Sequence, residues 1–165
     1  MSTKKIALLG ILLALNVAIS TYFFPVGENL RIYFTFLINM LIANIYDYPT
    51  VFIYAIIEDL VSFFVYPTGT FFLGYTLTSV LSLTLYYIFL HKEVNLKNVI
   101  LAKTSVNIFA NILLNSLWSK MLFGKAYIYY LSKSVIKNIL MIPIEVILFL
   151  AFYKLIKPMI DKIRA

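Results

Sequence analysis

The chain alternates between long apolar stretches and short polar ones, a pattern that predicts membrane-spanning helices. A helix that crosses a membrane needs about 20 mostly apolar residues. The pattern places six such helices over residues 5–24, 31–46, 49–66, 71–90, 99–121 and 131–155. The strict apolar–polar alternation of outer-membrane strands is absent. The sequence therefore predicts an all-α integral membrane protein, with a single bundle of six transmembrane helices over residues 1–165.

The composition agrees with a membrane location. Hydrophobic residues make up 62% of the chain and charged residues only 13%, whereas a soluble domain has about 25% charged residues. There are no cysteines, which excludes disulfides and thiolate sites, and no His/Asp/Glu cluster has the spacing of metal ligands. We therefore expect no cofactor or metal, and a lipid bilayer rather than nucleic acid as a partner.

Lysine and arginine residues indicate the orientation, because they are enriched on the cytoplasmic side of membrane proteins. With six spans both termini share one side, and nine of the fourteen positively charged residues, Lys103 among them, fall there. That side is expected to be the cytoplasmic face of a bacterial cell membrane. The five on the outer side are Arg31, Lys120, Lys125, Lys133 and Lys137. They are either interfacial anchors or, as we favour, part of an outward-facing site for an anionic ligand.

Three acidic residues interrupt the apolar stretches. Glu58 and Asp59 are adjacent and lie deep in the third expected helix, where a charge needs a partner or a wet cavity. Adjacent residues are about 100° apart around a helix axis, so we expect only one of them, Asp59, to face a pocket. Glu145, in the last helix, is expected to pair with a basic residue of the C-terminal tail.

The fifth expected helix carries Asn107, Asn111 and Asn115, which are four residues apart. An α-helix would place them on one face, with Trp118 next along it. Asn107 alone could serve as a hydrogen-bonding contact between helices. The first helix carries small residues with the same spacing, Gly10, Ala14 and Ala18. That spacing allows close helix contact and by itself favours packing inside the bundle over a docking face.

Four segments, in this order along the chain, resemble the substrate-binding S components of energy-coupling-factor (ECF) vitamin transporters, and in particular the folate-specific group. They are LRIYFTFL (30–37), EDL with VYPTGTFFLGYTLTS (58–60 and 65–79), LLNSLWSKMLFGKAY (113–127) and IKNILMIPIEV (136–146). The resemblance covers essentially the whole chain. It implies an S component that binds folate from outside and works with a membrane T component and two cytoplasmic ABC-type ATPases. Because ATP hydrolysis resides in those partners, the chain itself is expected not to be an enzyme.

The resemblance also implies roles for particular residues. Ala14 and Ala18, together with Gly10, correspond to the face that docks on the T component. The flat pterin ring of folate suits aromatic stacking and a few amide or carboxylate partners, and its glutamate tail needs cations. The expected stacking residues are Phe34, Phe64, Tyr66 and Trp118. The expected partners of the ring edge are Asp59, Asn111 and Asn115, and those of the tail are Arg31, Lys125, Lys133 and Lys137. Ser134 stands where the family has arginine, which makes the neighbouring Lys133 the expected substitute.

Three other interpretations remain open. An S component for another vitamin or pterin-like compound would share the fold, although a cationic vitamin would require acids rather than lysines at the entrance. A membrane-embedded enzyme would have only three acids and one histidine to work with. A small structural subunit would explain the small-residue face, but neither the lysines nor the asparagines.

Overall fold

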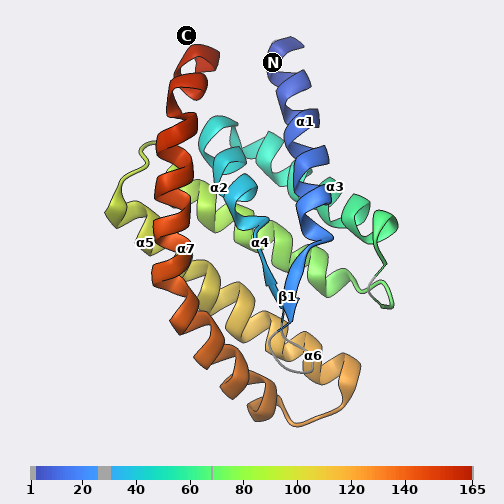
Figure 1. Ribbon diagram of the computed structural model, residues 1–165. Helices are drawn as coiled ribbons and strands as arrows, with labels where there is room; N and C mark the ends of the chain where they lie inside the picture. The colour runs from blue at the N-terminus through green and yellow to red at the C-terminus, as the bar shows by residue number, and fades with distance from the viewer. Residues whose placement is uncertain (1–2, 26–30, 68, 165) are drawn as a thin grey trace.

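The computed structural model describes residues 3–25, 31–67 and 69–164, of which the side chains of Pro25, Arg31 and residues 163–164 are left undescribed (Figure 1). Its helices are α1 (Thr3–Ser20), α2 (Phe36–Ile45), α3 (Tyr48–Val65), α4 (Leu73–Leu90), α5 (Leu96–Val106), η1 (Asn107–Leu114), α6 (Asn115–Phe123) and α7 (Tyr127–Arg164). Since α5, η1 and α6 follow one another without a break, the described residues form six continuous helices. The predicted six-helix bundle is confirmed.

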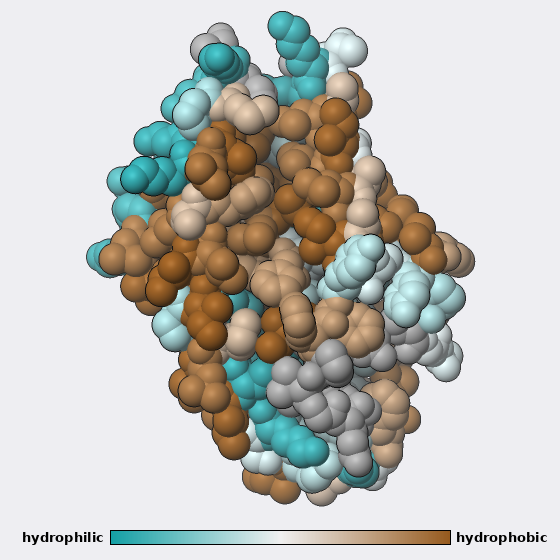
Figure 2. Space-filling view, viewed as in Figure 1, coloured by the Kyte–Doolittle hydropathy of each residue, from teal (hydrophilic) through white to brown (hydrophobic). Residues whose placement is uncertain are grey.

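Five of these helices are long and apolar enough to cross a membrane: α1, α3, α4, the continuous α5–α6 helix and α7. α2 has only 10 residues, about 15 Å of helix, against a hydrocarbon core of about 30 Å. Figure 2 shows hydrophobic side chains over the middle of the molecule, with hydrophilic ones near the two termini and at the opposite end. The chain is therefore a multi-pass membrane protein in which α2 is a short internal helix.

A β-hairpin replaces the expected junction of the first two helices. β1 (Phe23–Pro25) pairs antiparallel with β2 (Arg31–Tyr33), and Phe24 lies opposite Ile32. The predicted helix boundaries are wrong here: α1 ends four residues early, and α2 begins at Phe36 rather than residue 31. Aromatic and β-branched residues favour strands, and non-helical backbone is tolerated at membrane depth where it lines a cavity. Residues 26–30, between the first two predicted helices, lie outside the described residues.

The other helix ends follow local chemistry more closely. Asn95 caps α5 by accepting a hydrogen bond from the backbone N–H of Asn98 at 2.8 Å. α6 ends at Gly124, whose φ of +73° is the left-handed conformation that glycine adopts readily. α7 continues through Pro143 and Pro158 to Arg164, so the tail predicted to be a short basic extension is helical instead.

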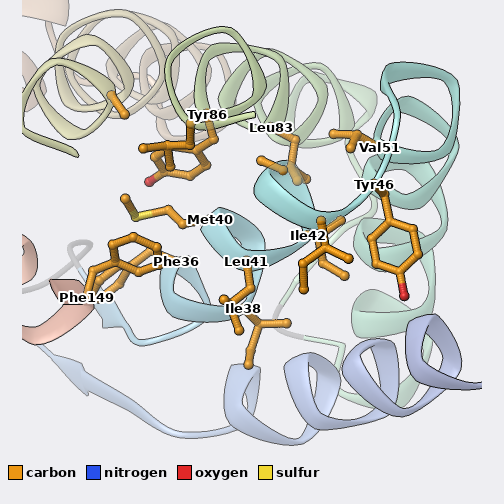
Figure 3. Packing of buried hydrophobic residues seen from close by; sticks show 14 of the residues in the cluster. Phe36, Ile38, Met40, Leu41, Ile42, Tyr46, Val51, Leu83, Tyr86 and Phe149 are labelled. Carbon is orange, nitrogen blue, oxygen red and sulfur yellow. The ribbon is translucent and has the colours of Figure 1, made fainter. Parts of the chain in front are cut away.

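The core is centred on α2, which is largely apolar and has eight of its ten residues buried. Met40, Ile42 and Ala43 have no exposed surface. Figure 3 shows α2 crossing the cluster, with Phe36 and Met40 near Phe149 of α7 and Tyr86 of α4. The core residues of α4 and α7 come from the parts of those helices nearer the termini in Figure 1, which leaves the other end of the bundle free for a cavity.

Candidate functional site

A cavity of about 570 Å³ lies among the helices at the end of the bundle away from the termini (Figure 1). Its wall is built from the last residue of α1, β2, the second half of α3, the first turn of α4, the η1–α6 region and the first turns of α7. Cavities that hold small organic ligands are typically about 300–1,000 Å³. The volume therefore suits a ligand of vitamin size.

Two carboxylates line the cavity side by side on α3. Glu58 is 8% exposed and accepts hydrogen bonds from Ser79 Oγ at 3.2 Å and Ser62 Oγ at 3.5 Å. Asp59 accepts one from Thr76 Oγ1 at 2.6 Å. The expectation that only one acid faces the pocket was wrong, because the cavity is wide enough to border two positions about 100° apart on the helix. These oxygens make one wall rich in hydrogen-bond acceptors.

The asparagines divide between the cavity and the core. Asn111 and Asn115 line the cavity, whereas Asn107 is completely buried and contacts Glu145 and Asn138. The division coincides with η1, a π-helix, whose i→i+5 hydrogen bonds widen each turn. Asn111 Nδ2 still donates to Asn107 Oδ1 at 2.9 Å, so these two side chains lie on one side of the helix, as the sequence suggested, and the edge of the cavity falls between them. π-helical segments are rare and occur frequently at functional sites.

Three buried polar atoms of the cavity wall have no hydrogen-bond partner among the described residues: Asn115 Oδ1, Ser116 Oγ and Tyr130 Oη. A buried polar group left unpaired costs about 1–3 kcal/mol. Nearly all buried polar groups in native structures are hydrogen-bonded to protein or to ordered water, so these three atoms are candidate positions for a bound water or ligand. Sequence analysis identified Asn115 but not Ser116 or Tyr130, because a serine or tyrosine in an apolar helix carries no distinguishing spacing.

The predicted aromatic residues lie in different places. Tyr66 lines the cavity, joined by Phe63, Phe71, Phe72, Tyr75 and Phe123, which sequence analysis did not single out. Trp118 lies behind the wall: its Nε1 donates to Thr78 Oγ1 at 2.9 Å, and its ring meets the lining residue Phe72 edge-on, with centroids 5.5 Å apart. Phe64 is 78% exposed, and Phe34 packs on Phe24 and Phe36 away from the lining.

Of the predicted cations, the structure brings Lys137 into the wall. Lys125 and Lys133 are exposed and lie over the ring of Tyr129, with Nζ 4.8 and 4.3 Å from its centroid. Lys133 Nζ also donates to Tyr129 Oη at 2.6 Å. Neither belongs to the lining, and the side chain of Arg31 lies outside the described part of the structure. The cavity therefore has its positive side chain on α7 and its acids on α3.

A buried ion pair lies outside the lining. Lys103 is 1% exposed, and its Nζ lies 2.9 Å from Glu145 Oε2. Two expectations are corrected: Lys103 is not a cytoplasmic flank, and Glu145 does not pair with the tail. Both corrections have the same cause, because a buried charge is stable only beside an opposite charge.

The small residues of α1 face outward. Gly10, Ala14 and Ala18 are all exposed, and a Cβ added to Gly10 would meet nothing within 4 Å. The packing inside the bundle that spacing alone favoured was therefore wrong. This side of α1 is an uncharged surface with little side-chain bulk, open to lipid or to another helix.

Apolar spanning helices around a cavity of this size define a multi-pass membrane protein with room for a small molecule. No family model matches the chain. It is 32% identical over 154 residues to the folate transporter FolT of Leuconostoc mesenteroides, covering 88% of this chain and 82% of the relative. The chain belongs to the FolT family of folate transporters. FolT of Clostridium novyi is 28% identical over 100 residues, 60% of this chain and 58% of the relative.

A crystal structure of FolT bound with folic acid has the same fold. It matches this structure with a TM-score of 0.82 and 31% sequence identity, covering 92% of each chain. The match spans both the apolar core and the cavity end of the bundle.

Proposed function

We propose that this chain is a high-affinity folate-binding S component of an ECF-type importer. It captures folate from outside the cell and delivers it inward together with a membrane T component and two cytoplasmic ABC-type ATPases. The observation that supports this most directly is a vitamin-sized cavity, with acids, amides and a lysine in its wall, in a member of the folate transporter family. ATP hydrolysis belongs to the partner subunits, and no residue of this chain is assigned a catalytic role.

The pterin ring is proposed to bind against α3 and the η1–α6 helix. Its pyrimidine edge carries N–H donors beside acceptors, which complement Asp59, Asn111 and Asn115. Glu58, next to Asp59 in the wall, joins this set. Tyr66 and Phe72 offer aromatic surface for the flat ring. Trp118 supports this surface through its edge-on contact with Phe72 rather than by stacking on the ligand.

The glutamate tail of folate is proposed to bind Lys137, because a charge-assisted hydrogen bond to a carboxylate is about twice as strong as a neutral one. Lys137 is the predicted cation that lines the cavity. Arg31, Lys125 and Lys133 remain predicted contacts of the tail. Phe34 and Phe64 remain predicted contacts of the ring.

The exposed side of α1 is proposed to dock on the T component. Gly10, Ala14 and Ala18 share this side, and small residues let helix backbones approach closely within a membrane. In the proposed orientation both termini are cytoplasmic, as the distribution of lysine and arginine indicates. The cavity, at the other end of the bundle, then opens toward the outside of a bacterial cell membrane.

A fluorescence titration of the purified chain tests the proposal. Trp118, the single tryptophan, touches a residue of the cavity wall, so a ligand that contacts Phe72 should change its emission. Folic acid is expected to bind more tightly than thiamine or riboflavin. Tighter binding of another vitamin would favour an S component of different specificity, and no binding of any vitamin by folded protein would favour a structural subunit.

A further inference from the structure

A chain of buried hydrogen bonds connects the Lys103–Glu145 ion pair to the cavity wall. Lys103 Nζ lies 2.9 Å from Glu145 Oε2, and Asn107 Nδ2 donates to the same oxygen at 3.3 Å. Asn107 Oδ1 in turn accepts from Asn111 Nδ2 at 2.9 Å. Asn111 lines the cavity, whereas Lys103, Asn107 and Glu145 do not. The ion pair is thus two hydrogen bonds away from the proposed ligand site.

The direction of this chain follows from what each group is able to donate or accept. A lysine ammonium only donates, and Lys103 Nζ is also within 3.2 Å of Tyr86 Oη, so Glu145 Oε2 serves as an acceptor. The second neighbour of Asn107 Nδ2 is the backbone carbonyl of Asn138, at 3.3 Å, which also only accepts. Asn107 must therefore turn its amide nitrogen toward α7 and its carbonyl oxygen toward Asn111.

The same reasoning determines the orientation of the side-chain amide of Asn111. Because Asn107 offers it an oxygen, Asn111 must use its Nδ2 there, and its Oδ1 is the atom left to present an acceptor to the cavity. The backbone of Asn111 is also held in place, because Ser134 Oγ donates to its backbone carbonyl at 2.9 Å. An asparagine amide without such neighbours is able to turn over and exchange its donor for its acceptor.

We propose that Asn107, oriented by the Lys103–Glu145 pair, is a positioning residue that sets Asn111 as an acceptor for an N–H donor on the ligand's ring edge. The proposal rests on the proposed function, in which that ligand is a folate. Asn111 Oδ1 then joins the carboxylates of Glu58 and Asp59 as acceptors in the cavity wall. The cavity would select ring edges carrying an amino group or a ring N–H, by way of a residue that never touches the ligand.

Asn107→Leu tests this inference, because leucine has a similar volume and no polar atom. The probes are folic acid and two analogues, one with methyl in place of the 2-amino group and one methylated at ring N3. Wild-type protein should prefer folic acid over at least one analogue. Losing one oriented hydrogen bond, about 1 kcal/mol, should lower that preference about five-fold in Asn107→Leu.

Asn44→Leu is the matched control. Asn44 is another buried asparagine, donates to the backbone carbonyl of Leu90 at 2.7 Å, and lies away from the cavity. A general loss of stability would weaken all three ligands together and leave their ratios unchanged, as expected for this control. Unchanged ratios for both analogues in Asn107→Leu would overturn the proposal.

A second variant tests the same inference if Asn107→Leu does not fold. The double substitution Lys103→Met/Glu145→Leu removes both charges together, which avoids leaving one buried and unpaired. It should lower the preference in the same direction but by less, because the Asn138 carbonyl still orients Asn107. Unchanged ratios in the double variant would overturn the role of the ion pair. If wild-type protein does not bind folic acid, the proposed function itself fails, which is a distinguishable result.

Discussion

Gly74 lies where α4 begins and where Phe72, which lines the cavity, meets Trp118 behind the cavity wall. A Cβ at this position would lie 2.8 Å from Trp118 Cδ2 and closer still to the ring of Phe72. Carbon atoms in favourable contact are about 3.5–4.0 Å apart, so Trp118 would have to move by roughly 0.7 Å or more. Gly74→Ala therefore forces Phe72 and Trp118 away from α4.

The expected cost has two parts. Inserting one methyl into a tightly packed site typically costs about 1–3 kcal/mol of folding free energy. If Trp118 moves enough to break its hydrogen bond to Thr78, about 1 kcal/mol more is lost. Because Phe72 lines the cavity, we also expect folic acid to bind about ten-fold more weakly, equivalent to about 1.4 kcal/mol.

Tryptophan emission of the ligand-free protein and a folic acid titration measure both effects. Gly10→Ala is the matched control, since a Cβ at Gly10 meets nothing within 4 Å and alanine is favoured over glycine in a helix by about 0.5–1 kcal/mol. The control should keep wild-type emission and affinity. A Gly74→Ala protein with unchanged emission and unchanged affinity would refute the packing argument.

Three further outcomes are expected. Lys137→Ala should weaken folic acid binding by about 1.5–3 kcal/mol but hardly affect binding of a pterin that lacks the glutamate tail. Lys133→Ala, outside the cavity lining, should have the smaller effect on folic acid binding. Equal losses of affinity for both ligands in paired titrations of Lys137→Ala would count against a tail contact at Lys137. Asp59→Asn should weaken both ligands alike, by about ten-fold, because both share the ring, and a loss confined to folic acid would move Asp59 to the tail. Ala18→Trp, on the exposed side of α1, should leave folic acid binding intact and abolish uptake in cells that supply the partner subunits. Uptake at the wild-type level by a well-expressed Ala18→Trp protein would place the docking surface elsewhere.

The number and order of the helices could be predicted because length and apolarity are local properties of the chain. The hairpin could not, since residues 31–33 lead directly into an apolar stretch and only their pairing with residues 23–25 makes them a strand. The π-helix could not be predicted from the sequence either. Its hydrogen bonds belong to the backbone, and nothing in the side chains of Asn107–Leu114 marks the wider turn.

For the candidate site, residue types were easier to predict than positions. Asp59, Asn111, Asn115 and Lys137 were noticed as polar residues in apolar helices, whereas Tyr66 was expected from the family resemblance as a stacking residue. All five line the cavity. The lysines show the limit of this reasoning. Lys133 and Lys137 are one helical turn apart on α7, yet Lys137 lines the cavity and Lys133 does not. The pairing of Lys103 with Glu145 depends on how α5 packs against α7, which the sequence does not show.

The dense packing around α2 bears on the ion gradients of the membrane that holds this protein. The side chains of Met40, Ile42 and Ala43 are completely enclosed, and closely packed apolar groups surround them. An ion is costly to place among apolar groups that offer it no polar partner, so packing of this kind opposes ion leakage. A protein with a cavity at one end and close packing at the other can bind a polar cargo without letting ions leak across the membrane. The cargo can then reach the far side only if the helices, or the whole protein, move relative to the bilayer.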